Sequence, residues 1–463
     1  MHSRTTANAA AIFACALGCT LGMGWTPARA QEEAPPPPPP APPASGEASG
    51  RFEFTAGVDL EHDTNINLSE SNPVSQDVLM PTFAFTYNEQ GSVLEAHAAG
   101  HVQYRDYLGG AFADEFTGTA SAIFDWHILP NRFDWSAEDY VGYQPVNVLA
   151  NNVPNNQQET NVFVTGPTLR AHFTDELRGQ FDLRYTNSYA ETTREFNGDR
   201  IGGIARIIDL LTPADTLSGN LGFQSVRYDN VPDTNDYDRT DAYGSYVRTG
   251  PHSRLEADLG YTWLDFKGNA EDHSGIFFRA NGRYDFAEHT IGTLTLSRTF
   301  SDAVQFLQVD PGQVGQVVIG SGLTGALVSP SVYKEDRIAG SLQQGGQTYT
   351  LTFTPFWYRD DYLNTEGQVV STGLNVRAYG FYGAYDYRIQ QDLTLGAFVG
   401  TERRNYTDLV RTDKVYDFGL HLGWQIAQHW ASRLALSREI QATNAPDLSY
   451  HGNVIAVGVT YSR

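Results

Sequence analysis

The chain has 463 residues, a formal net charge of −23, and 41% hydrophobic residues. This acidic balance argues against a nucleic-acid partner, because neutralising phosphates requires clustered Lys and Arg. After residue 30 no apolar run approaches the ~18 residues that a membrane-spanning helix needs, which excludes a helical membrane protein, whereas 12% aromatic residues and 44 glycines favour strands and turns.

Residues 1–30 have the features of a secretory signal peptide. Arg4 lies in a short basic region, an apolar stretch covers residues 9–21, and Ala28-Arg29-Ala30 forms a small-x-small cleavage site. Leu17-Gly18-Cys19 suggests a lipoprotein signal as an alternative, but its Leu is one place too close to the Cys for the usual pattern. We therefore expect a cleaved signal peptide and a mature chain that leaves the cytoplasm.

Cleavage changes the chemistry available to the mature chain. Both cysteines, Cys15 and Cys19, would be removed, which leaves no disulfide or cysteine metal site. Loss of Arg4 and Arg29 would change the net charge from −23 to −25. Residues 31–50 are rich in proline, which predicts a disordered periplasmic linker of polyproline II character, with a partner-docking role as the alternative.

From Arg51 onwards polar and apolar residues alternate with a period of two. Residues 51–61 alternate without a fault, which is typical of a strand with one apolar and one polar face. The same alternation recurs in residues 94–105, 116–126, 177–185, 255–263, 276–286 and 454–461. The chain therefore predicts a succession of amphipathic strands.

The connections between these strands alternate between short and long. Short turns are predicted near residues 88–91, 129–131, 174–176, 250–252, 345–346 and 427–429. Longer polar loops are predicted at residues 62–76, 143–159, 230–237, 266–273, 302–331 and 359–370. Transmembrane β-barrels show this asymmetry, with short periplasmic turns and long extracellular loops.

Strand length and aromatic positions favour the same architecture. Strands of about 12 residues, tilted by about 40–45°, stand ~28–30 Å tall, which matches the apolar band of an outer-membrane barrel. Aromatic residues collect at the short-turn end in Phe124, Trp126, Phe133, Trp135, Trp424 and Trp430. A second girdle is predicted at the loop end in Tyr104, Tyr107, Tyr140, Tyr143, Tyr185, Tyr261, Trp263, Trp357 and Tyr358. A soluble β-core, the alternative, explains the composition but not these positions.

We predict an all-β fold for residues 51–463: a transmembrane antiparallel up-and-down β-barrel of about 18–20 strands. An even number of strands would place both chain termini in the periplasm. A barrel of this size leaves an aqueous lumen unless something plugs it.

Several short segments resemble the putative β-barrel porin 2 family of Gram-negative outer-membrane proteins, many of them associated with exopolysaccharide systems. The matching segments are residues 63–66, 166–167, 226–230, 236–239, 259–262 and 457–461. One departure is the Ser462-Arg463 end, where such proteins tend to finish on an aromatic residue. The resemblance implies an outer-membrane barrel and, less directly, a role in polysaccharide export or uptake. It supplies no catalytic motif.

The polar face of the strands supplies the candidate site, because this face would line the lumen. By alternation, we predict that fourteen side chains point inward: Glu95, His97, His101, Gln103, Arg105, Arg170, His172, Arg178, Asp182, Arg184, Glu256, Asp258, Arg279 and Arg283. Acids and arginines mix in this set, so opposite charges can pair across strands or hydrogen-bond to sugar hydroxyls and anionic groups. The residues alone leave structural pairing and sugar contact equally open.

We predict no catalytic, cofactor or metal residues. His97 and His101 have a helical metal-site spacing, but on a strand four residues span ~13 Å, too far for one zinc ion. The acid, base and hydroxyl of Asp272-His273-Ser274 are adjacent in sequence, which specifies no triad geometry. The acidic residues 233–238 could bind Ca²⁺, but they lack the Gly and Glu of an EF-hand loop, so a solvated loop is favoured.

The leading hypothesis is a non-enzymatic outer-membrane conduit that assists exopolysaccharide export in a Gram-negative bacterium. Its expected partners are outer-membrane lipid and lipopolysaccharide, the outer-membrane assembly machinery and periplasmic polysaccharide-export components. One alternative is a general porin or uptake channel. Another is a non-conducting surface barrel whose loops bind a partner and whose lumen is plugged by residues 302–331, where residues 317–319 and 323–328 are apolar.

Overall fold

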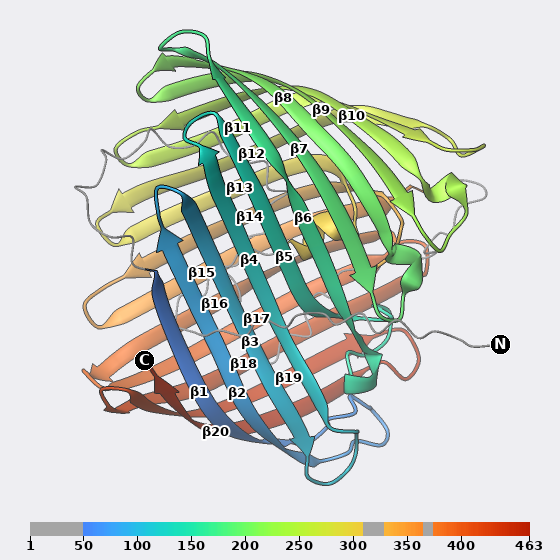
Figure 1. Cartoon of the computed structure of the whole chain (residues 1–463). Helices are drawn as coiled ribbons and strands as arrows, with labels where there is room; N and C mark the ends of the chain where they lie inside the picture. The colour runs from blue at the N-terminus through green and yellow to red at the C-terminus, as the bar shows by residue number, and fades with distance from the viewer. Residues whose placement is uncertain (1–49, 309–327, 364–373) are drawn as a thin grey trace, which may run out of the picture.

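Twenty antiparallel strands form one closed sheet in the part of the chain that the structure describes (Figure 1). The structure is a computed structural model, and it describes residues 50–308, 328–363 and 374–463. The predicted signal peptide, the predicted linker up to residue 49, and the apolar residues 317–319 and 323–327 lie outside these ranges. The expected barrel of about 18–20 strands is confirmed.

Each strand pairs with its neighbours in chain order, and β1 pairs with β20 to close the barrel. The strands run as follows: β1 Arg51–Asp63, β2 Gln76–Gln90, β3 Leu94–Tyr107, β4 Glu115–Leu129, β5 Phe133–Pro145, β6 Gln157–His172, β7 Leu177–Ala190, β8 Gly198–Thr212, β9 Asp215–Tyr228, β10 Tyr237–Thr249, β11 Ser253–Phe266, β12 His273–Ala287, β13 Thr290–Ser301, β14 Tyr333–Gly345, β15 Tyr349–Tyr362, β16 Val376–Gln390, β17 Leu393–Tyr406, β18 Arg411–Ala427, β19 Trp430–Thr443 and β20 Tyr450–Ser462.

The two ends of the barrel differ in their connections. At one end, the short-turn end, successive strands are joined by two to four residues, as between β8 and β9. At the other, the loop end, most connections are longer, and the longest joins β13 to β14 through residues 302–332. Helical turns occur only there in the described residues: η1 Pro154–Asn156, η2 Arg194–Phe196, η3 Asp233–Asn235 and α1 Ala303–Leu307. None of the described helices is long and apolar enough to cross a membrane.

The alternation of the sequence separates an apolar outer face from a polar inner face. On β1, for example, the Val58 and Leu60 side chains are each 49% exposed, whereas Asp59 between them is 2% exposed. Asp59 accepts a hydrogen bond from Arg433 Nε on β19 at 2.8 Å. This contact passes over Gly458 on the intervening strand β20, where a Cβ would overlap the Asp59 carboxylate. The glycine therefore gives the buried Asp59 carboxylate and its ion pair with Arg433 their space at the seam where the barrel closes.

The aromatic girdles are largely as predicted, with three exceptions. Trp126, Trp135, Trp424 and Trp430 at the short-turn end, and Tyr185 and Trp263 at the loop end, are all exposed on the outer face. The assignment of Tyr107, Tyr140 and Tyr358 to the outer girdle is wrong. Tyr107 and Tyr140 are each 3% exposed and pack on the inner face, and Tyr358 donates a hydrogen bond to the buried Glu402 at 2.9 Å. Along their strands these three residues alternate with outer side chains, so they face inward although they lie near a strand end.

Candidate functional site

All fourteen residues predicted to point inward lie on the face opposite to the exposed apolar side chains. On β3, for instance, Val102 is exposed on the outer face with Phe83 of β2 opposite it, so its neighbours His101 and Gln103 point inward. On β7 the exposed Phe181 and Leu183 place Asp182 on the inner face. The structure therefore gives these side chains the orientation that alternation requires. That they contact a passing solute remains a prediction.

The inner wall carries opposite charges that pair both along single strands and across neighbouring strands. Arg279 Nε lies 3.1 Å from Asp258 Oδ2, and Asp182 lies within 4.0 Å of both Arg184 and Arg206. Further contacts of the predicted residues join Arg170 with Asp134, Glu95 with His127, His97 with Asn88, Glu256 with Arg254 and Arg283 with Asp285. Because each acid lies near a base, the charges of the inner wall largely cancel locally, and such opposite-charge pairs stabilise the sheet.

A segment of the longest loop folds onto this inner wall. Asp302, directly after β13, lies beside Arg200 of β8, with 2.5 Å between Oδ2 and Nη1. Tyr237 Oη of β10 donates to the same oxygen at 2.7 Å. The other carboxylate oxygen accepts from the backbone N–H groups of Val304 and Gln305 at 3.0 and 3.3 Å, which caps the first turn of α1. The segment is thus fixed by one carboxylate that uses both its oxygens.

The Asp302 carboxylate is stable as an anion in this position. Arg200 and Asp302 are each 2% exposed. Burial raises the pKa of Asp302, but the charge of Arg200 and the hydrogen bonds from Tyr237 and Arg200 outweigh burial, so the pKa lies below its usual value. Removing either partner would leave a buried charge without compensation.

Apolar packing holds α1 against strands far from β13. Val304 and Leu307 belong to a buried cluster with Tyr140 of β5 and Val162 of β6, and Phe196 of η2 joins them. Strand β6 is seven strands away from β13 along the sheet, so the segment reaches well around the inner wall. Val328, on the far side of the undescribed part of this loop, joins the same cluster. The described parts of the 302–331 loop therefore fold inward, as the plug hypothesis requires, although they do not show a closed lumen.

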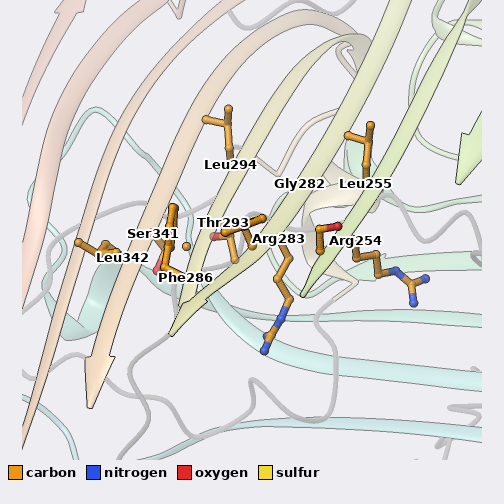
Figure 2. A pocket seen from close by; sticks show the side chains of 12 residues that line it. Arg254, Leu255, Gly282, Arg283, Phe286, Thr293, Leu294, Ser341 and Leu342 are labelled. Carbon is orange, nitrogen blue, oxygen red and sulfur yellow. The ribbon is translucent and has the colours of Figure 1, made fainter. Parts of the chain in front are cut away.

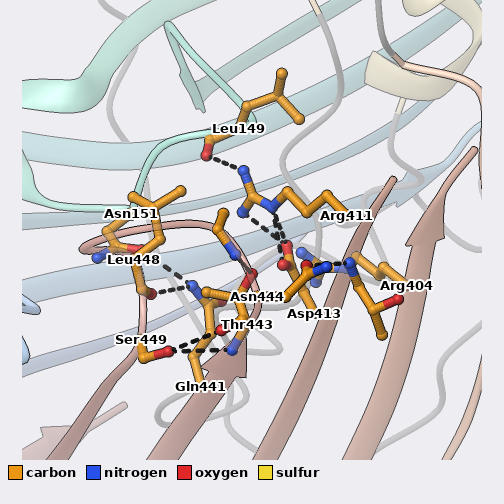
Figure 3. A network of polar contacts seen from close by, with 12 residues as sticks. Leu149, Asn151, Arg404, Arg411, Asp413, Gln441, Thr443, Asn444, Leu448 and Ser449 are labelled. Atoms are coloured by element: carbon orange, nitrogen blue, oxygen red, sulfur yellow. Dashed lines mark hydrogen bonds and ion pairs between the residues drawn. The ribbon is translucent and has the colours of Figure 1, made fainter. Parts of the chain in front are cut away.

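The connection between β5 and β6 reaches residues of β18 and β19, which lie six to eight strands away around the closed sheet (Figure 3). Arg411 Nη1 of β18 donates to the Leu149 carbonyl at 2.7 Å, while the same guanidinium binds Asp413, which is 1% exposed. Gln441 Nε2 of β19 donates to Asn151 Oδ1 at 3.0 Å, and Asn151 Nδ2 donates to the Leu68 carbonyl at 2.7 Å. This loop therefore spans part of the mouth of the barrel.

A separate cavity of about 470 Å³ lies at the short-turn end of β11 to β14 (Figure 2). Leu255 and Leu294 point to one side of the sheet and Arg283 to the other. Gly282 and Gly292 carry no side chain on the leucine side, and a Cβ on Gly292 would come within 2.6 Å of the Phe286 ring. The cavity is thus mainly a gap in the apolar outer face, and it lacks the converging polar groups of a typical ligand site.

Several residues that shape the lumen were not among the predicted set. Arg200 and Arg206 alternate with the exposed Ile201 and Ile207 on β8, so the period-two pattern contains the signal for their orientation. Asp302 gave no such signal, because it lies in a loop and its partner Arg200 is 102 residues away. Among the described residues no group of three or more His, Cys, Asp or Glu side chains could hold a metal ion.

The chain is similar to solved outer-membrane proteins at low sequence identity. A mutant of the ferric enterobactin receptor PfeA of Pseudomonas aeruginosa matches with a TM-score of 0.48 and 10% identity over 90% of this chain and 81% of that one. The FrpB iron transporter of Neisseria meningitidis, F3-3 variant, gives 0.41 and 10% over 88% and 81%. OpdK of Pseudomonas aeruginosa, with vanillate, gives 0.35 and 9% over 89% and 99%. At these scores the likenesses carry no functional argument.

No curated protein matches the chain. The sequence profile of the family described as putative beta-barrel porin 2 matches residues 364–463, which include β16 to β20. This match covers part of the region in which the sequence resembles that family, including the segment at residues 457–461. The resemblance to the putative β-barrel porin 2 family is therefore confirmed over residues 364–463, the last part of the closed 20-stranded barrel.

Proposed function

We propose that the protein is a passive conduit in the outer membrane of a Gram-negative bacterium, with its loop end outside the cell and its short-turn end in the periplasm. The exposed apolar side chains around the barrel support this placement, because an outward apolar band between aromatic girdles is what a bilayer requires. The match to a porin family supports transport rather than surface adhesion. Assembly of the barrel by the outer-membrane assembly machinery is part of the same proposal.

The proposed cargo is an exopolysaccharide, moved outward with the help of periplasmic export components. The observation that carries this proposal is the composition of the inner wall, where guanidinium groups lie over tyrosine rings. Arg279 lies 5.7 Å from the centre of the Tyr243 ring, Arg337 lies 5.6 Å from that of Tyr358, and Arg411 lies 5.3 Å from that of Tyr406. Planar guanidinium groups and carboxylates hydrogen-bond sugar hydroxyls and anionic groups.

Oligosaccharide block of the reconstituted channel tests the cargo directly. Purified barrel in a planar bilayer should show brief current interruptions when oligosaccharide fragments of the host's exopolysaccharide are added, and their frequency should rise with concentration. Deleting the gene should also reduce surface polysaccharide. An unblocked current together with normal polysaccharide in the deletion strain would contradict export and favour a general porin or uptake channel.

A non-conducting surface barrel is the second candidate. It is favoured by two contacts at the loop end: α1 packs against β5 and β6, and the β5–β6 loop reaches Arg411 on β18. If these segments close the lumen, the folded barrel should carry no current, and its surface loops would act by binding a partner. Conductance in a planar bilayer separates the two candidates.

A further inference from the structure

Four basic side chains form a continuous row on the outer face near the loop end. Arg359 on β15, Arg377 on β16, Arg403 on β17 and Lys414 on β18 share the register parity of the exposed outer side chains, such as Tyr379, which is 48% exposed. They lie on four successive strands, so at ~4.8 Å per strand the row is about 14 Å wide. We call these four residues the basic row.

The sheet register places like charges directly opposite one another in this row. Arg359 pairs with Arg377 across β15 and β16, and Arg403 pairs with Lys414 across β17 and β18. Between these two pairs, Arg403 directly faces Tyr379 of β16, so it lies diagonally across from Arg377. Like charges opposite each other destabilise a sheet. Two such pairs side by side therefore indicate a surface that is completed by an anion.

Among the residues that the structure describes, most of the row has no counter-charge. Arg359 forms an ion pair with Asp361, with 2.6 Å between Nη2 and Oδ2. Arg377, Arg403 and Lys414 form no ion pair within the described ranges, and Arg403 Nε donates only to the amide oxygen of Asn405 at 3.2 Å. The three unpaired side chains are all exposed.

Elsewhere on the outer face near the loop end, basic side chains such as Arg227 and Arg298 are paired with acidic ones. Acidic side chains occupy corresponding outward positions on other strands, among them Asp106, Asp139, Asp199 and Asp265. The chain as a whole has a net charge of −23. Anion attraction is therefore a local property of β15 to β18 and does not follow from the overall composition.

The height of the row on the barrel identifies the anion. On the same outer faces, the next side chains toward the short-turn end are the exposed aromatic rings of Tyr379, Tyr416 and Phe418. Aromatic belts mark the headgroup level of a membrane, and a basic row immediately beyond them lies at the level of lipid phosphates. We propose that the basic row binds the phosphate groups of a phosphorylated glycolipid of the outer leaflet, namely lipopolysaccharide.

Binding of purified lipid A to the full-length, detergent-folded barrel tests this site. It rests on the proposed outer-membrane placement but needs no conductance, so it can fail or succeed separately from the channel proposal. The probe is lipid A with both phosphates, compared with the same lipid after enzymatic dephosphorylation. The variant R377Q/R403Q removes two unpaired charges, and the matched control R227Q/R298Q removes two outward arginines that have their own partners, Asp238 and Asp336. A heat-modifiable shift on a denaturing gel confirms that each variant folds.

We expect phosphorylated lipid A to bind the wild type and the control equally well, and to bind R377Q/R403Q about 30-fold more weakly, since each basic residue near an anionic lipid surface contributes about a fivefold effect. Dephosphorylated lipid should show the weak affinity with all three proteins. Equal loss in the variant and the control, or equal binding of the two lipids, would overturn the proposal. Complete competition by millimolar inorganic phosphate would also overturn it, because it would show that a free anion is the ligand.

Discussion

The carboxylate of Asp302 provides the sharpest test of how the lumen is narrowed. The substitution D302N keeps a side chain that can cap α1 but removes the charge that compensates Arg200, which is 2% exposed. Breaking a buried ion pair by neutralising one partner costs about 3–5 kcal/mol, which would shift the docking equilibrium of the segment about 150- to 5,000-fold toward release. If the docked state outnumbers the released state by about 1,000 to 1 in the wild type, which corresponds to about 4 kcal/mol, the segment in D302N would be released for a large part of the time.

We therefore expect D302N to show a higher mean conductance than the wild type in planar bilayers, with added slow transitions between a lower and a higher level. The control is D215N at the short-turn end. Asp215 likewise accepts from a tyrosine, Tyr246 at 2.6 Å, and from an arginine, Arg248 at 3.2 Å, but it belongs to no inward-folded segment. If D302N and D215N both conduct as the wild type does, the segment at residues 302–308 does not limit the current, and the reasoning is refuted.

Three further outcomes follow from the same contacts. The pKa of Asp302 is lowered in the folded state, so its contribution to docking is fully present above the ordinary Asp pKa and is lost as the pH falls through the lowered value. We therefore expect wild-type conductance to rise below about pH 3.9, whereas the conductance of D302N should not change with pH in this range. Substitution R411Q should speed backbone hydrogen exchange around Leu149 by ~5- to 150-fold, since it removes a hydrogen bond of about 1–3 kcal/mol, whereas R438Q on the outer face should not change it. Finally, G458A should lower the unfolding midpoint by an amount equivalent to ~1–3 kcal/mol, because the added Cβ overlaps Asp59. The control G423A should have little effect, because a Cβ there meets no atom within 4 Å. Equal midpoints for the two variants would contradict this account of the seam.

The sequence predicts the barrel well because one physical rule governs most of it. A strand with lipid on one side and water on the other must alternate, so Val58, Asp59 and Leu60 reveal their faces without any structure. The same rule orients all fourteen predicted inner side chains. It also corrects the aromatic assignment: Tyr358 follows Trp357 directly, so the two rings cannot share a face, and only the register shows that Tyr358 is the inner one.

The narrowing of the lumen could not be predicted in the same way. Asp302 and Arg200 are separated by 102 residues and meet only because a loop turns inward, and no periodicity encodes that direction. The contact of Arg411 with the Leu149 carbonyl is of the same kind, since a backbone acceptor has no sequence signature. The apolar character of the 302–331 loop indicated that it could pack, but the strands against which it packs are fixed by the curvature of the closed barrel.

Single-channel recording of the wild-type barrel in a planar bilayer tests the central claim most directly. The sample must first show a heat-modifiable gel shift and a β-sheet signal in detergent, so that only folded protein is measured. The proposed conduit predicts discrete conductance steps of uniform size. A correctly folded sample that inserts into the bilayer and gives no steps would contradict an open lumen and leave the non-conducting surface barrel as the function to pursue.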